Sequence, residues 1–278
     1  MEQYDLHCHS TASDGALTPR EVVLRAHEQG VTALALTDHD TIDGLAEAQH
    51  TASEVGMRFI PGIELSSIWE NKCFHIIGLG IDSNHPTLLD GIRTQQEIRA
   101  ERAKKIARKL ENKCIPGAYE AVKATAGKGM ITRSHFADYL VANGFVNTQQ
   151  EAFDKYLARG KPAYVATSWA DLREAIDWIK TSGGIAVLAH PLRYKLSGNW
   201  MSRALTAFKN AGGQGMEVVT GCSSPDDIQR SHFLAQKFQL LASQGSDFHS
   251  PKYAWVELGR VAELPAGSQP VWEKLTGF

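Results

Sequence analysis

Apolar runs of strand length alternate with helical segments along this chain, and that alternation limits the fold more than any other feature. The runs cover 31–37, 58–66, 185–189, 215–219 and 240–246. Most of them are separated by segments whose apolar residues recur at helical spacing. Strands that alternate with helices in this way form βα units and a parallel sheet. We therefore expect an α/β protein.

Histidines and carboxylates gather at or near the ends of these strands. His7 and His9 lie two residues apart on an expected strand, so both side chains point the same way, about 7 Å apart at the backbone. Two histidines spaced in this way also occur on ordinary half-buried strands. Here, however, five strand ends offer histidine or carboxylate side chains. Parallel sheets and β/α barrels carry their chemistry at the carboxyl ends of their strands. The candidate residues are His7, His9, Asp14, His39, Glu64, His75, His190, Asp247 and His249.

This set of side chains predicts a metal centre. Imidazole and carboxylate donors without a pair of thiolates suit Mn, Fe or Zn rather than a closed structural zinc site. Nine donors are too many for one ion, so we expect two or three ions, with Glu64 as the bridge through its two oxygens. Such clusters activate water near neutral pH and neutralise the charge of a phosphate. Cys8, between the two strand histidines, should face the core as a small buried hydrophobe.

Bulk properties narrow the class of protein without identifying it. The 278 residues carry a formal net charge of -2, which argues against coating of nucleic acid by bulk electrostatics, and we expect no DNA readout. The first residues lack a basic segment followed by an apolar run, and no stretch of about 20 apolar residues could span a bilayer. The four cysteines show no paired spacing. A reduced, cytoplasmic location away from membranes is the simplest expectation.

The segment from 87 to 161 departs from the alternating pattern. We expect it to form a small helical insertion that caps a discontinuous barrel domain made of 1–86 and 162–278. Residues 97–111 read as one long, charged helix with Ile98, Ile106 and Leu110 at helical spacing. The Lys and Arg residues of that helix are expected to form a solvated face, balanced by nearby acids.

Several short motifs together resemble the polymerase and histidinol phosphatase (PHP) family, nearly from end to end. They are His7-Cys8-His9, Asp14-Gly15, Thr37-Asp38-His39-Asp40, Pro61-Gly62-Ile63-Glu64, His75, His190-Pro191 and Gly245-Ser246-Asp247-Phe248-His249. Residues 132–136 and 155–161 of the insertion are similar to the bacterial branch that includes RNase AM and the nucleoside 3',5'-bisphosphate phosphatases. The resemblance implies a distorted (β/α)7 barrel of the PHP type with a small helical insertion.

The resemblance also implies a trinuclear centre, commonly of manganese, with Zn²⁺ and Fe²⁺ as the alternatives. Carried over residue by residue, the family's pattern assigns His7, His9 and Asp247 to the first ion, and Glu64 bridges the first ion and the second. The pattern assigns His75 and His190 to the second ion. It assigns Asp14, His39 and His249 to the third. Every position of the family's ligand set is filled in this sequence.

On the substrate side, Arg133 and Arg193 are the best candidates to grip phosphate, because guanidinium groups match phosphate oxygens bidentately. By resemblance both line the pocket, and His135 is expected to join them or to act as a general acid. Lys161 is a candidate to neutralise a second phosphate. The alternatives are that Arg133 forms a surface ion pair and that Lys161 is an ordinary exposed lysine.

The function implied by the resemblance is hydrolysis of the 3' phosphoester next to a nucleotide whose 5'-phosphate is held in a pocket. That single reaction covers a 5'-to-3' exoribonuclease that trims ribosomal RNA 5' ends and short oligoribonucleotides, and a nucleoside 3',5'-bisphosphate 3'-phosphatase. One alternative is a phosphomonoesterase for a small metabolite, of the histidinol phosphatase kind. A second is a non-catalytic metal-binding module, which the complete ligand set disfavours.

Overall fold

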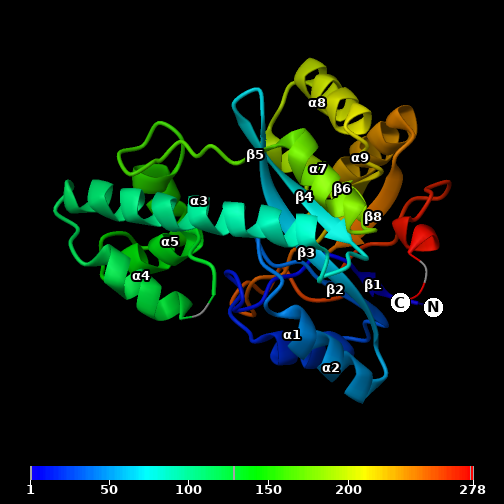
Figure 1. The fold of residues 1–278 in the computed structure, drawn as a ribbon, viewed down its shortest axis with the longest axis horizontal. Helices are drawn as coiled ribbons and strands as arrows, with labels where there is room; N and C mark the ends of the chain where they lie inside the picture. The colour runs from blue at the N-terminus through cyan, green and yellow to red at the C-terminus, as the bar shows by residue number, and fades with distance from the viewer. Residues whose placement is uncertain (1, 128, 276, 278) are drawn as a thin grey trace.

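A curved sheet of eight strands organises the fold of this protein (Figure 1). The computed structural model describes residues 2–127, 129–275 and 277. Along the sheet the order is β1-β2-β3-β4-β6-β7-β8, and β5 pairs with β3 away from this path. The strands are β1 (Tyr4–Asp5), β2 (Ala33–Leu36), β3 (Arg58–Trp69), β4 (Lys72–Leu79), β5 (Ala170–Asp171), β6 (Ile185–Leu188), β7 (Gly215–Thr220) and β8 (Leu241–Gly245).

The first and last strands of the path meet, so the sheet closes into a barrel. The backbone N–H of Leu6 donates to the carbonyl of Gln244 at 3.1 Å, and the N–H of Asp247 donates to the carbonyl of His7 at 2.7 Å. The expected barrel of seven strands with a small helical insertion is thereby confirmed.

The expectation of an all-parallel sheet was wrong for β4. This strand runs antiparallel to both of its neighbours, β3 and β6. Only Glu70 and Asn71 separate β3 from β4, and their φ angles of 45° and 61° form a tight hairpin turn. Two residues cannot supply the crossover helix that a parallel neighbour requires. This hairpin is the distortion of the barrel.

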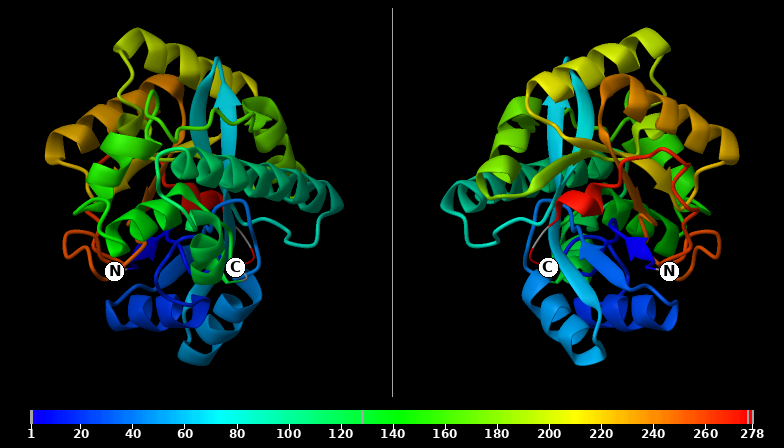
Figure 2. Two further views of the ribbon diagram at one scale, coloured as in Figure 1. Left: turned by 90° about the vertical axis from the view of Figure 1, so that its left-hand side faces the viewer. Right: turned by 90° about the vertical axis from the view of Figure 1, so that its right-hand side faces the viewer.

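Helices cover the outside of the barrel on opposite flanks, as the two side views in Figure 2 show for α1 and α2 against α8 and α9. Several of them start at a capping box. In this motif the side chain of the residue before the helix accepts the backbone N–H three residues later, and the side chain of that later residue accepts the backbone N–H of the first. In α1 the pair is Thr18 and Glu21, and in α9 it is Ser224 and Asp227. These outer helices are α1 (Pro19–Glu28), α2 (Leu45–Val55), α7 (Leu172–Thr181), α8 (Gly198–Asn210) and α9 (Pro225–Phe238).

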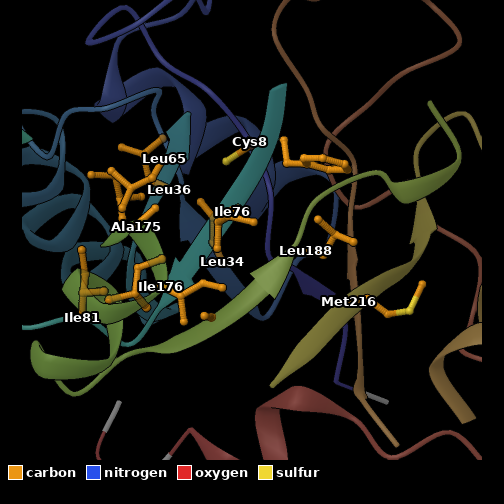
Figure 3. Close-up of a cluster of buried hydrophobic side chains, with 14 of the residues drawn as sticks. Cys8, Leu34, Leu36, Leu65, Ile76, Ile81, Ala175, Ile176, Leu188 and Met216 are labelled. Atoms are coloured by element: carbon orange, nitrogen blue, oxygen red, sulfur yellow. The ribbon is translucent and has the colours of Figure 1, made fainter. Parts of the chain in front are cut away.

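Alternate residues of the strands fill two separate apolar layers. Leu34 and Ile76 point outward against the helices, and Figure 3 shows them beside Ile176 of α7. The next residue of β4 after Ile76 is Ile77, and it points into the barrel. There Val271 of the short helix η3 (Val271–Lys274) closes one end. Because one end of the interior is packed with apolar side chains, the polar residues of the strands collect at the other end.

The insertion has an apolar core of its own, built around Ile106, Leu110, Phe136 and Leu140. Its long helix α3 starts at Pro86, eleven residues before the expected 97–111 segment, because Pro86 occupies the first turn after an extended His85. In Figure 1 this helix runs from the sheet to the group formed by α4 and α5. The insertion's elements are α3 (Pro86–Glu111), α4 (Ala118–Ala126), α5 (Arg133–Ala142), α6 (Gln149–Ala152) and the π-helix η1 (Phe153–Leu157).

The first half of α3 packs on the barrel, where Leu88 and Ile92 join the outer apolar layer, and its second half builds the insertion. The division at residues 87 and 161 stays a prediction. Among the described helices, none is both long enough and apolar enough to cross a membrane.

Candidate metal centre

The nine candidate residues converge at the polar end of the barrel. His7 and His9 follow β1, His39 follows β2, and a parallel bridge joins His39 to Glu64. Glu64 and His75 lie within β3 and β4 rather than at strand ends, since this hairpin extends beyond the rest of the sheet. Asp14 comes from the loop after β1 and His190 from the loop after β6. The loop after β8 supplies Asp247 and His249.

Glu64 stands at the centre of this group, which we call the metal cluster. Its Oε1 lies 3.0 Å from His75 Nδ1, 3.2 Å from His190 Nε2 and 3.4 Å from His7 Nε2. Its Oε2 lies 2.8 Å from His39 Nδ1 and 3.4 Å from His9 Nε2. One buried carboxylate thus contacts imidazoles from five positions through both of its oxygens, which is the geometry of a bridging ligand.

Two carboxylates complete the cluster on either side of His9. Asp247 Oδ1 lies 3.3 Å from Nε2 of both His7 and His9. Asp14 Oδ1 lies 3.4 Å from His249 Nε2 and 3.9 Å from His39 Nε2. Three sets of donor atoms are close enough to hold an ion each: His9, Asp14, His39 and His249; His7, His9 and Glu64; and His39, Glu64 and His75.

The protonation properties of these groups show how strongly they depend on one another. Burial raises the pKa of Glu64, but the nearby imidazoles of His39, His75 and His7 outweigh it and hold that pKa well below its usual range. Burial lowers the pKa of His75, yet the Glu64 carboxylate raises it to about 10. Burial and the neighbouring His249 lower the pKa of His9 to about 4, so His9 offers a free lone pair at neutral pH. The ionised Glu64 and the neutral His9 are in the states that bind metal, whereas His75 would release its proton when a metal binds.

The sequence analysis missed Glu217 of β7, which contacts two residues of the metal cluster. The Nδ1–H of His7 donates to Glu217 Oε1 at 2.9 Å, and the backbone N–H of His190 donates to Oε2 at 2.6 Å. This bond fixes the tautomer of His7 so that Nε2 faces the cluster. The signal in the sequence was a single carboxylate inside an apolar strand, a residue that is rarely buried without a partner.

The backbone is held in an unfavourable conformation at three positions of the site. Asp40, His190 and Asp247 have φ angles of 50°, 29° and 56°, in the left-handed region that side chains rarely adopt. Such conformations persist where the surrounding structure imposes them, and they concentrate at functional sites.

A cleft of about 620 Å³ opens beside the metal cluster. Arg99, Arg102 and Arg133 line it on one side together with Trp169, and Arg193 lines it beside Asp247. We call the part around the first three the arginine cleft. The expectation of a solvated face on α3 was wrong for Arg99 and Arg102, which are only 3% and 7% exposed.

Arg99 has a carboxylate partner, whereas Arg102 has none within the described residues. Arg99 donates to Asp40 Oδ2 at 2.6 Å and to Ser66 Oγ at 3.0 Å. Arg102 stacks on Trp169, with its guanidinium carbon 4.8 Å from the ring centre, and it forms no ion pair within the described residues. Burial together with the charges of Arg99 and Arg133 lowers the pKa of Arg102 well below its usual range. The arginine cleft is therefore a positive site whose geometry suits an anion.

The four residues expected on the substrate side lie in different surroundings. Arg133, at the start of α5, and Arg193 line the large cleft, and the Arg193 guanidinium also pairs with Asp247. His135 Nδ1 accepts the backbone N–H of Thr132 at 3.1 Å in the cap of α5, outside the residues that line the cleft. Lys161 is exposed in the loop after η1 and is not among the residues that line the large cleft. Cys8 is buried in the outer apolar layer, as expected.

Known proteins resemble this chain along nearly its whole length. The model of the PHP domain family matches residues 5–209. A 5'-3' exoribonuclease of Haemophilus influenzae is 47% identical over 98% of this chain and 99% of its own. A 3',5'-nucleoside bisphosphate phosphatase of Chromobacterium violaceum is 43% identical over 99% of this chain and 97% of its own.

A solved structure also matches the fold. An amidohydrolase from Chromobacterium violaceum, with bound sulfate and no metal, superposes with a TM-score of 0.94 at 43% identity, covering 98% of this chain and 95% of its own. The resemblance noted in the sequence motifs is thus confirmed by the family match, by relatives of equal length and by the fold. This chain belongs to the PHP domain family.

Proposed function

We propose that this protein is a metal-dependent phosphoesterase that hydrolyses the 3' phosphoester of a nucleotide whose 5'-phosphate it holds. The substrates would be RNA 5' ends, trimmed stepwise as by a 5'-to-3' exoribonuclease, and nucleoside 3',5'-bisphosphates. The single observation that carries this proposal is the arginine cleft beside the metal cluster, because it offers an anion site next to a phosphoester-cleaving centre. Names of the relatives from Haemophilus influenzae and Chromobacterium violaceum point to the same two reactions.

The residues present fit divalent metal ions. His7 Nε2 and His9 Nε2 lie 3.1 Å apart and face each other, and His9 Nδ1 is buried without a hydrogen-bond partner among the described residues. Buried polar atoms in this state are costly unless a cation binds them. We propose three manganese ions. The first would be held by His7, His9, Asp247 and Glu64, the second by Glu64, His75 and His190, and the third by Asp14, His39 and His249.

When bound, these ions supply the Lewis acidity that activates water and offsets the negative charge on the reacting phosphate. The protein's own residues do the positioning. Glu217 orients His7, and the Arg193 guanidinium beside Asp247 can donate to an oxygen of the scissile phosphate. The leaving group is the 3' oxygen of the nucleotide, so the released nucleotide keeps its 5'-phosphate.

The arginine cleft would hold that 5'-phosphate. Arg102 is buried and has no carboxylate partner among the described residues. Arg133 faces the same cleft, and Trp169 provides a flat ring between Arg99 and Arg102. A 5'-phosphate bound here would be satisfied by guanidinium donors on more than one side. Substrates without it would leave buried charge uncompensated.

The two alternative functions are less well supported. A phosphomonoesterase for a small metabolite needs no second anion site, and the buried Arg102 would then have no anionic partner. A non-catalytic module has no need of a complete donor set, and all nine donors are retained in one cluster.

The test uses manganese-loaded protein with adenosine 3',5'-bisphosphate, a 5'-phosphorylated RNA oligomer and its 5'-hydroxyl twin. We expect hydrolysis of the first two and resistance of the third. Cleavage of both oligomers at equal rates would contradict the 5'-phosphate site. Hydrolysis of the bisphosphate alone would limit the protein to nucleotides and remove the RNA role.

A further inference from the structure

A second, smaller cleft opens on the other side of Arg193. It has a volume of about 270 Å³, near the lower end of the range usual for small-molecule sites. Its walls come from the loops after β6 and β7 and from the first turns of α9, and include Lys195, Thr220, Cys222, Ser223 and Ser231. We call it the side cleft. It lies at the same edge of the barrel as the metal cluster, where β6 and β7 end.

The side cleft and the large cleft share two residues, His190 and Arg193. His190 faces Glu64 in the metal cluster, and Arg193 pairs with Asp247. The two spaces therefore meet at the point where the scissile phosphate would lie under the proposed function. No similar connection is needed for a bisphosphate, which ends at that phosphate.

RNA differs from a bisphosphate by one substituent on the scissile phosphorus. In RNA this phosphorus carries a further ester oxygen that leads to the next nucleotide, and that nucleotide keeps the phosphate when the 3' ester is cleaved. The arginine cleft is already assigned to the 5'-phosphate of the nucleotide that is released. The rest of the strand must leave the site by another route.

The chemistry of the side cleft suits a sugar–phosphate strand. Lys195 is exposed and forms no ion pair within the described part of the chain. The hydroxyls of Thr220 and Ser223 lie 3.0 Å apart, and either can turn to a ligand. Two carboxylates line the side cleft, and both already have partners. Glu217 accepts from His7 and from the backbone N–H of His190, and Asp227 accepts the hydroxyl of Ser224 at 2.7 Å in the cap of α9.

We propose that the side cleft binds the nucleotide immediately downstream of the scissile phosphate, with Lys195 at that nucleotide's own 3'-phosphate. The proposal rests on the proposed function and deepens it, because it makes the side cleft the element that separates action on RNA from action on bisphosphates. The ligand class is a 5'-phosphorylated oligoribonucleotide of at least three nucleotides.

The test compares a 5'-phosphorylated triadenosine with adenosine 3',5'-bisphosphate on manganese-loaded protein. We expect Lys195→Gln to lower kcat/KM for the triadenosine by about tenfold and to reduce the slope of its salt dependence by about one. Hydrolysis of the bisphosphate should stay within about twofold of the parent protein. Lys195→Arg, which keeps the charge, should restore the triadenosine activity. Lys237→Gln, in the last turn of α9, is the matched control.

Lys195 has a φ of 50°, so the side-chain change could disturb the turn that carries Arg193. Cys222→Phe provides an independent variant, because it fills the side cleft from an exposed position. It should weaken binding of a triadenosine with a methylene group in place of the first 3' bridging oxygen, while binding of the bisphosphate is retained.

The outcomes separate the two proposals. If the parent protein hydrolyses neither substrate, the proposed function fails and this inference fails with it. If the parent hydrolyses both and the side-cleft variants affect both equally, or neither, the function stands and the inference is overturned.

Discussion

Glu217 accepts the Nδ1–H of His7 at 2.9 Å, at the floor of the metal cluster. The same carboxylate accepts the backbone N–H of His190, so one side chain orients the ring of His7 and holds the backbone at His190. Carboxylates in this position fix the ring of a metal-binding histidine and raise its basicity.

The substitution Glu217→Gln should weaken metal binding without unfolding the barrel. An amide still fills the space but cannot accept from both neighbours with a full negative charge, and loss of such a partner costs about 10- to 100-fold in metal affinity. Competition with a chelator, followed by metal analysis of the desalted protein, measures this directly. Glu263→Gln, at an exposed position, is the control and should leave the affinity unchanged. Equal affinity in Glu217→Gln and the parent protein would show that the contact has no such role.

Arg102→Gln should reduce recognition of the 5'-phosphate selectively. Hydrogen bonds to charged groups contribute about 1.5–3 kcal/mol, so kcat/KM for adenosine 3',5'-bisphosphate should fall by about 10- to 100-fold. Adenosine 3'-monophosphate, which lacks the second phosphate, should be hydrolysed at an unchanged, low rate. Arg108→Gln removes a charge from an exposed position of the same helix and serves as the control. A parallel loss with both substrates would mean that Arg102 supports the fold rather than the ligand.

Gly91→Ala should destabilise the protein although alanine favours helices. Gly91 lies within α3, where an added Cβ would stand 2.3 Å from the ring of Trp178 on α7. Overpacking of this kind costs about 1–3 kcal/mol, which outweighs a gain in helix propensity of about 1 kcal/mol. Chemical denaturation measures the difference. Gly198→Ala is the matched control, because open space surrounds that glycine at the start of α8, and its stability should not fall.

The pair formed by Arg25 and Glu257 should make stability depend on pH in the acid range. The Arg25 guanidinium donates to Glu257 through Nε at 2.9 Å and Nη2 at 2.6 Å, and this bonding lowers the pKa of Glu257 below its ordinary value of 4.5. The contribution is therefore fully present above pH 4.5 and is lost as the pH falls through the lower folded-state pKa.

We expect Glu257→Gln to lower the free energy of unfolding by about 1 kcal/mol at pH 7, and the gap to the parent protein to close below pH 4.5. Metal-depleted protein is used for both, so that acid release of metal does not enter the comparison. Arg25→Gln and the double variant complete the cycle. A gap that stays constant down to pH 3 would contradict the assignment.

The parts of this site that sequence could predict are those attached to short motifs at strand ends. His7, His39, His190 and Asp247 each lie two or three residues after a strand, and parallel strands bring their carboxyl ends to one edge. Glu217 has no such motif, because it lies inside β7 and its role comes from the neighbouring strands.

The arginine cleft was hidden by the charge of α3. Arg99 and Arg102 resemble the exposed Lys104 and Lys105 in composition, yet they share a helix face with Ile106 and Leu110, which is the buried one. The spacing 99, 102, 106, 110 is a helical stripe, so its polar members are buried with its apolar members. Their partner Asp40 comes from another part of the chain, and sequence spacing does not reveal that contact.

The metal cluster draws on both ends of the chain, since His7 lies near the first residue and His249 near the last. A growing chain still attached to the ribosome exposes the first histidines early, but the barrel cannot close until β8 has emerged beside β1. Under the proposed function, a chain whose synthesis has not yet passed β8 cannot assemble the metal cluster, so nuclease activity arises only after that strand has joined the barrel.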